Sequence, residues 1–123
     1  MAKAKILVVD DEKDLVDMLI IRLEAADYEV HAAYDGQEGL NKVKEIMPDI
    51  ILLDVMMPKL DGYQVCRLLK FDEKFKNIPI IMLTARGQEQ DKETGGQVGA
   101  DMYVTKPFES ADLVQKIEGL LTK

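Results

Sequence analysis

The stretch DIILLDVMMPKLDGYQVCRLLK, residues Asp49–Lys70, contains one complete unit of the pattern that decides the fold. Ile50–Leu53 is a continuous apolar run, which is typical of a parallel strand buried on both faces. Asp54 ends that run, and Gly62–Phe71 follows as a predicted helix. The apolar residues of this helix recur at helical spacing: Val65, Leu68 and Leu69. A buried strand that leads into a helix indicates a βαβ fold.

The same unit recurs in both directions from this stretch. The predicted strands are Lys5–Val9, Tyr28–Ala33, Ile50–Leu53, Pro79–Leu83 and Met102–Thr105. The other clear helices are Lys13–Ala26, Gly36–Met47, which Pro48 ends, and Ser110–Leu121, with Ser110 as a candidate N-cap. Right-handed crossovers place helices on both faces of such a sheet. We therefore predict an α/β fold, a flavodoxin-like doubly wound (βα)5 three-layer sandwich with a parallel sheet of order 2-1-3-4-5.

One segment fits the pattern poorly. Gln88–Val98 (QEQDKETGGQV) occupies the place of the fourth helix, yet it has almost no apolar residue before Val98. It also contains Gly95 and Gly96, and each glycine costs about 0.5–1 kcal/mol relative to alanine inside a helix. We expect this helix to be the least firmly anchored element of the domain.

Composition narrows the possible classes of protein. The 123 residues suit one domain, residues 1–123, and 47% apolar with 32% charged residues is ordinary for a globular chain. The net charge of −7 argues against direct binding of nucleic acid. No apolar run is long enough for a membrane span, and MAKAKILVV does not resemble a signal peptide, so we expect a cytoplasmic protein. The single cysteine, Cys66, excludes a disulfide within the chain.

Polar residues follow four of the five predicted strands. Asp10 and Asp11 follow the first strand, Asp54 the third, Thr84 the fourth and Lys106 the fifth. Because the carboxyl ends of parallel strands meet at one edge of a sheet, we expect these side chains to be neighbours. Three clustered carboxylates repel one another and need a counter-charge. A divalent cation that prefers oxygen ligands, Mg²⁺ or Mn²⁺, would supply it, and Lys106 suits a phosphate oxygen.

These motifs carry a resemblance to a known family. ILVVDDE, DIILLDVMMPKLDGYQVCRLLK, IPIIMLTARGQ and GADMYVTKPF resemble the receiver domains of bacterial two-component response regulators, including chemotaxis regulators. The resemblance extends from Lys5 to about Leu121. It implies that Asp54 is the phosphoacceptor, with Asp10 and Asp11 as the acidic metal pair and the Met56 backbone carbonyl as a further metal ligand.

The resemblance also implies a switch. Thr84 would be the hydroxyl that reaches the phosphoryl group, Lys106 its cationic partner, and Tyr103 the aromatic residue that changes rotamer. The Lys106–Pro107 bond would be cis. The phosphoryl donor would be a histidine kinase or a phosphotransfer protein, and the face made by the fourth helix, the fifth strand and the fifth helix would control an unidentified output partner. The chain would be a monomer or a dimer promoted by phosphorylation, with no effector domain.

Three other functions compete with this interpretation. A phosphatase of the haloacid dehalogenase type needs a second acid in DxDx[TV], but Asp54 is followed by Val-Met-Met. A nucleotide- or flavin-binding module needs a glycine-rich turn after the first strand, where this chain has Asp-Asp-Glu. A pseudo-receiver, which acts as a protein-binding scaffold without phosphorylation, stays open as the alternative.

Overall fold

The computed structural model describes residues 3–58, 60–85 and 99–122. The strands are β1 (Lys5–Val9), β2 (Glu29–Ala33), β3 (Ile50–Asp54), β4 (Ile80–Ala85) and β5 (Met102–Lys106). The helices are α1 (Lys13–Ala25), α2 (Gly36–Ile46), α3 (Gly62–Lys70) and α5 (Ser110–Leu121). The predicted fourth helix, Gln88–Val98, lies outside the described residues.

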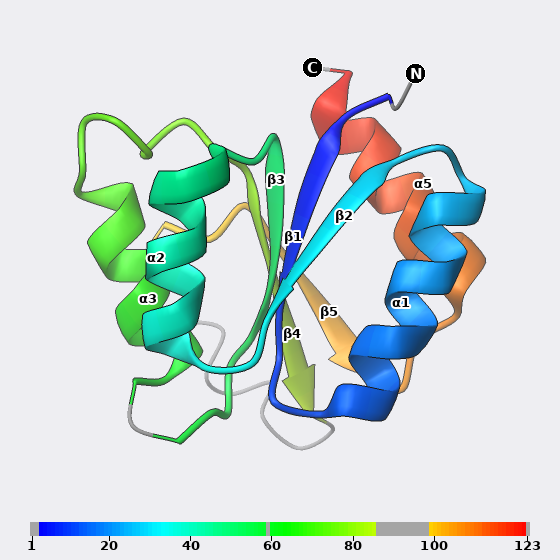
Figure 1. Ribbon diagram of the computed structural model, residues 1–123, viewed down its shortest axis with the longest axis horizontal. Helices are drawn as coiled ribbons and strands as arrows, with labels where there is room; N and C mark the ends of the chain where they lie inside the picture. Colours follow the sequence, from blue (N-terminus) through cyan, green and yellow to red (C-terminus); the bar gives the residue numbers. More distant parts are fainter. Residues whose placement is uncertain (1–2, 59, 86–98, 123) are drawn as a thin grey trace.

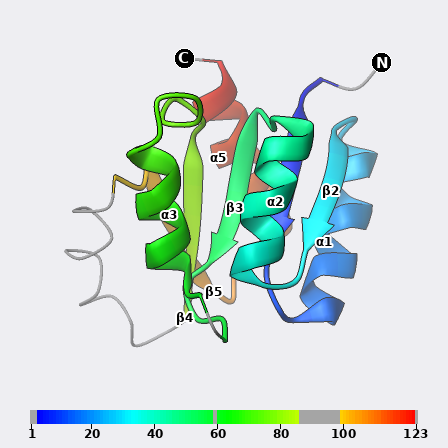
Figure 2. The same ribbon diagram turned by 60° about the vertical axis from the view of Figure 1, so that its left-hand side comes forward.

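The five strands form one parallel sheet with the order β2-β1-β3-β4-β5. Helices α1 and α5 cover one face, and α2 and α3 cover the other (Figure 1). This arrangement confirms the predicted three-layer fold and its sheet order. Figure 2 shows the strands ending at the edge of the sheet opposite to the two labelled chain ends. None of the described helices combines the length and the hydropathy that crossing a bilayer requires.

Alternating residues along each strand supply two separate core clusters. Leu7 and Val9 of β1 pack on the side of α2 and α3, whereas Ile6 and Val8 pack on the side of α1 and α5. All four side chains are fully or almost fully buried. Burying an aliphatic side chain of this size contributes about 1.5–3 kcal/mol, so the two clusters fix the sheet between its helices. Cys66 of α3 is buried in the first cluster, as a small apolar residue would be.

Side-chain caps begin two of the helices. The Asp35 carboxylate accepts a hydrogen bond from the Glu38 N–H at the start of α2. At the start of α3, Asp61 and Gln64 form a reciprocal capping box. Such caps typically contribute about 1 kcal/mol each. The α3 box matters for the site because it fixes the helix that follows Asp54.

The predicted N-cap of α5 was wrong. Ser110 is the first residue of the helix, and Glu109 occupies the extended N-cap position without a capping side chain. The Ser110 hydroxyl instead donates to the Met18 sulfur at 3.3 Å and links α5 to α1. A residue inside the first turn cannot cap that turn, because capping requires extended backbone one position earlier. The Lys106–Pro107 bond before α5 is cis, as expected.

Candidate functional site

The predicted site residues meet at the carboxyl edge of the sheet. Asp54 ends β3, Thr84 lies near the end of β4, Lys106 ends β5, and Asp10 directly follows β1. Asp10, Asp54 and Thr84 are buried, although all three are polar. Asp11 is exposed. The strand ends therefore place a small polar cluster on an otherwise apolar sheet.

Three carboxylates of this cluster could hold a cation. One oxygen each from Asp10, Asp11 and Asp54 lies within 4.8 Å of the other two. Carboxylate oxygens in this arrangement suit Mg²⁺, which takes a few protein oxygens and keeps several waters. The Met56 N–H points to this cluster and lies 3.4 Å from the Asp54 Oδ1. The role of the Met56 carbonyl oxygen as a ligand stays a prediction.

Lys106 supplies the positive charge among these acids. Its Nζ lies 2.8 Å from Asp10 Oδ2, 3.1 Å from Glu12 Oε1 and 3.3 Å from Asp54 Oδ1. The contacts with Asp10 and Asp54 were expected, but the sequence reasoning missed Glu12. The only available signal for Glu12 was its position directly after the acidic pair, at the N-cap of α1.

The acids and the lysine change one another's ionisation. Burial, followed by the nearby charge of Asp10, raises the pKa of Asp54 to about 6, against opposing effects of Lys106 and the Met56 N–H. Burial alone would lower the pKa of Lys106, but its hydrogen bond to Asp10 and the charge of Asp54 raise that pKa above its ordinary value. These shifts favour the charged ammonium of Lys106 and the protonated form of Asp54.

Two buried hydroxyl groups, one on β4 and one on β5, lack hydrogen-bond partners among the described residues. They are the Thr84 Oγ1 and the Tyr103 hydroxyl. Tyr103 pairs in register with Met82 and packs against the cluster beneath α3. Burial, with smaller effects of Tyr63 and Cys66, raises the pKa of Tyr103 to about 12. A buried hydroxyl without a hydrogen-bond partner destabilises the folded protein, so a new hydrogen bond to either group would be favourable.

The backbone around Asp54 depends on a close approach of α3. The Gly62 N–H donates to the Val55 carbonyl oxygen at 2.9 Å. A Cβ at position 62 would overlap the carbonyl oxygen of Asp54. Glycine therefore lets the first turn of α3 pack directly on the strand end that carries Asp54. The sequence pattern indicates Gly62 as the start of a helix but not its close approach to the Asp54 backbone.

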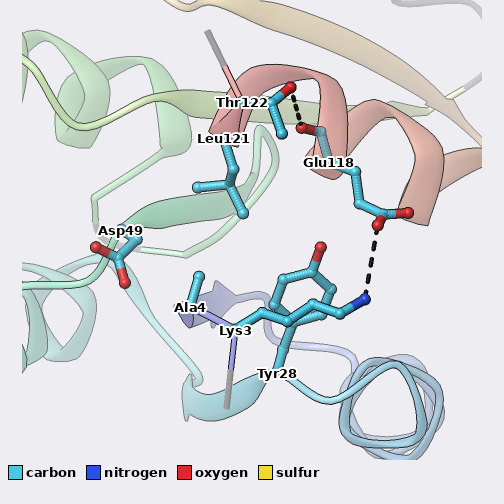
Figure 3. Close-up of a pocket in the computed structure, with 7 residues that line it drawn as sticks. All are labelled: Lys3, Ala4, Tyr28, Asp49, Glu118, Leu121 and Thr122. Atoms are coloured by element: carbon cyan, nitrogen blue, oxygen red, sulfur yellow. Dashed lines mark hydrogen bonds and ion pairs between the residues drawn. The ribbon is translucent and has the colours of Figure 1, made fainter. Parts of the chain in front are cut away.

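Among the hollows of the described surface, two differ in their distance from this cluster. One of about 440 Å³ adjoins the site between α1 and the loop after β5, and it is lined by Glu12, Leu15, Met18, Ala85, Lys106, Pro107 and Phe108. The other, of about 340 Å³, lies at the opposite edge of the sheet (Figure 3). There the Lys3 ammonium pairs with Glu118 at 3.6 Å and lies above the Tyr28 ring. This second hollow takes no part in the strand-end cluster.

Comparisons with known proteins agree with this geometry. The family model described as the response regulator receiver domain matches residues 6–118. The chain is 44% identical over 119 residues to the DNA-binding dual master transcriptional regulator RpaA of Synechocystis, an alignment that covers 97% of this chain and 49% of RpaA. The chain thus spans about half the length of this curated relative.

Solved structures give the same result. A putative response regulator from Chloroflexus aurantiacus superposes with a TM-score of 0.92 at 37% identity, covering 98% of both chains. The Vibrio cholerae chemotaxis protein CheY4 superposes with a TM-score of 0.91 at 35% identity, covering 98% of this chain and 100% of CheY4. The likeness extends over the whole sheet and its flanking helices.

Proposed function

Because the chain belongs to the response regulator receiver domain family, which works in two-component signalling, we propose that Asp54 accepts a phosphoryl group. The donor is a histidine kinase or a phosphotransfer protein. The observation that carries this proposal is the Lys106 ammonium, which contacts the carboxylates of both Asp10 and Asp54. A cation held between a nucleophilic carboxylate and a metal-binding acid suits phosphoryl transfer better than a purely structural ion pair.

Asp10, Asp11 and Asp54 would hold Mg²⁺ or Mn²⁺, with the Met56 carbonyl as a further ligand. Their oxygen atoms and their spacing within 4.8 Å fit such a cation. When bound, the cation supplies positive charge to the oxygens of the phosphoryl group. With that charge beside it, Asp54 would remain ionised as a nucleophile at neutral pH despite the neighbouring carboxylates.

The protein's own residues then have separate roles. An Asp54 carboxylate oxygen forms a bond to phosphorus while the bond between phosphorus and the donor's nitrogen breaks. Lys106 balances the charge on the phosphoryl oxygens. The Thr84 hydroxyl, which is buried without a partner among the described residues, donates to one of those oxygens. Thr84 is in register with Thr105, and Tyr103 lies two positions before Thr105 on the same strand. A movement of the Thr84 side chain towards the phosphoryl group therefore changes the space in which the Tyr103 ring packs.

We extend the proposal to the output of this switch. Tyr103 lies on β5, so its rotamer alters the face that includes β5 and α5, and this face controls a partner protein in the cytoplasm. The described chain acts as a single receiver domain, as a monomer or as a dimer promoted by phosphorylation. The alternative is a pseudo-receiver scaffold that binds its partner without phosphorylation.

Intact-mass measurement after incubation with acetyl phosphate and Mg²⁺ tests the proposal. We expect the wild-type protein to gain one phosphoryl group, which Asp54→Asn does not gain. Omitting Mg²⁺ should abolish the gain in the wild type. A wild-type protein that gains no phosphoryl group, or an Asp54→Asn variant that gains as much as the wild type, would favour the scaffold or another acceptor.

A further inference from the structure

The Lys106 ammonium already has as many partners as it has protons. A lysine ammonium carries three N–H donors and accepts no hydrogen bond. Its described partners are three carboxylates, those of Asp10, Glu12 and Asp54. A phosphoryl oxygen that binds Lys106 must therefore replace one of these three acceptors.

The three partners differ in how firmly they are held. The side chains of Asp10 and Asp54 are 0% and 7% exposed, whereas that of Glu12 is 62% exposed. Asp10 is further fixed because its Oδ1 accepts the Glu12 N–H at 2.9 Å. A buried carboxylate that loses its cation is strongly destabilised, but an exposed one returns to water at little cost. Glu12 is thus the partner that Lys106 gives up most easily.

We propose that Glu12 is a positioning residue that occupies one hydrogen-bonding position of Lys106 until a phosphoryl oxygen replaces it. This inference rests on the proposed phosphorylation of Asp54. It adds that the Glu12 carboxylate competes with a phosphoryl oxygen for the Lys106 ammonium. The Glu12 carboxylate stabilises the unphosphorylated state by pairing with Lys106, and its negative charge opposes the arrival of an anion at the same ammonium. Glu12 therefore sets how readily the site takes a phosphoryl group, without touching that group itself.

The expected effect is modest because the Glu12 side chain is exposed. Exposed ion pairs contribute little free energy, so loss of the Glu12–Lys106 pair should change the affinity for a phosphoryl mimic by about 1.5- to 5-fold. Removing the carboxylate should not disturb the start of α1, since Glu12 occupies the N-cap position without making a side-chain cap. Asp14, an exposed acid in the first turn of the same helix, offers a matched control for the loss of one negative charge.

Beryllofluoride, a phosphoryl mimic, tests this inference by titration at saturating Mg²⁺ on wild type, Glu12→Gln and Asp14→Asn. We expect Glu12→Gln to bind about 1.5- to 5-fold more tightly and Asp14→Asn to bind like wild type. In a crystal structure of the wild-type complex, Glu12 should no longer contact the Lys106 Nζ. Urea unfolding of the three proteins shows whether any difference reflects folding instead.

Each other outcome has a definite meaning. Unchanged or weaker binding by Glu12→Gln, or an equal gain in Asp14→Asn, overturns the role of Glu12 and leaves the proposed function standing. A retained Glu12–Lys106 contact in the complex also overturns it. No binding of beryllofluoride by the wild type overturns both this inference and the proposed phosphorylation.

Discussion

The Lys106 ammonium lies 3.3 Å from the Asp54 carboxylate and so joins the ends of two strands that are not paired with each other. Strand β4 separates β3 from β5 in the sheet, so the ion pair spans the end of β4. The pair therefore holds three strands in a fixed relation at the edge where the site lies. A change in the charge of Asp54 therefore acts directly on Lys106 at the end of β5.

The raised pKa of Asp54 predicts a pH-dependent free energy of unfolding without divalent cations. The ordinary pKa is 3.8 and the folded value is about 6. The folded state therefore binds the proton more tightly, and the stability that Asp54 contributes is full below pH 3.8 and lost as pH rises through about 6. Urea unfolding should show Asp54→Asn to be more stable than wild type by about 1–2 kcal/mol at about pH 7.5.

At about pH 4.5 this difference between Asp54→Asn and wild type should shrink, because Asp54 is then largely protonated in the folded state, whereas in the unfolded state, with a pKa of 3.8, it is still mostly ionised. Asp17→Asn removes an exposed acid of α1 and is the control for the loss of one charge. An Asp54→Asn variant less stable than wild type at neutral pH would contradict the prediction.

Protons and metal should compete for the same carboxylates. Since the pKa of Asp54 is about 6, Mg²⁺ should raise the melting temperature clearly at about pH 7.5 and much less at about pH 5. Asp11→Asn should weaken Mg²⁺ binding by about tenfold or more, since loss of even an outer-shell partner of a metal ligand typically costs about 10- to 100-fold. Thermal unfolding across a Mg²⁺ series measures both effects. Equal shifts at the two pH values would exclude Asp54 as a ligand.

Removal of the Lys106 charge should leave two buried acids without compensation. We expect Lys106→Met to lower the free energy of unfolding by about 3 kcal/mol at neutral pH without metal. Mg²⁺ should restore part of this loss, because it supplies positive charge to the same carboxylates. Lys116→Met, which removes an exposed pair with Asp112 on α5, is the control and should cost about 0.5 kcal/mol or less. Similar losses in the two variants would argue against the buried cluster.

Two glycines offer a matched pair of substitutions in helices. Gly62→Ala places a Cβ against the Asp54 carbonyl oxygen and should destabilise the protein by about 1–3 kcal/mol. Gly119→Ala adds a Cβ in open space on α5 and should stabilise by about 0.5–1 kcal/mol. Chemical denaturation of both variants measures the contrast. A stabilising Gly62→Ala would show that α3 does not pack on Asp54 as closely as described.

The unpaired hydroxyls predict opposite effects on stability and on switching. Thr84→Val and Tyr103→Phe each remove a buried hydroxyl without a partner among the described residues, so the unphosphorylated protein should gain up to about 1 kcal/mol. Thr84→Val should also weaken beryllofluoride binding, because the donor to the phosphoryl oxygen is gone. Urea unfolding and beryllofluoride titration separate the two effects. A clear loss of stability in Thr84→Val would reveal a hydrogen bond already present at this hydroxyl.

Most of the fold followed from residues that the chain must bury. Apolar runs such as Ile50–Leu53 can lie only in the middle of a covered sheet, so they fixed the strands and the layers. The strand-end acids and Lys106 then had to meet at one edge, as they do. The ends of the helices were less predictable. At the start of α5, either Glu109 or Ser110 could have been the N-cap, and the local sequence does not decide between two adjacent residues.

Contacts between distant side chains were beyond the sequence pattern. Glu12 has no periodicity that aims it at Lys106, which is 94 residues away in the chain. The role of Gly62 depends on how closely α3 approaches the Asp54 backbone, a distance set by tertiary packing. The unpaired state of the Thr84 hydroxyl depends likewise on every neighbour of β4. These features follow from three-dimensional packing and not from residue type or spacing.

The alternation of β5 and its neighbours also provides the protein with its own spectroscopic probes. Met82 is fully buried in register with Tyr103, Met102 packs in the cluster on the other face of the sheet, and Met56 is 62% exposed beside Asp54. Methyl resonances of these methionines would report separately on the site, on the α3 side and on the α5 side. Labelling methionine alone would therefore reveal on which faces of the sheet the packing changes, with no residue changed.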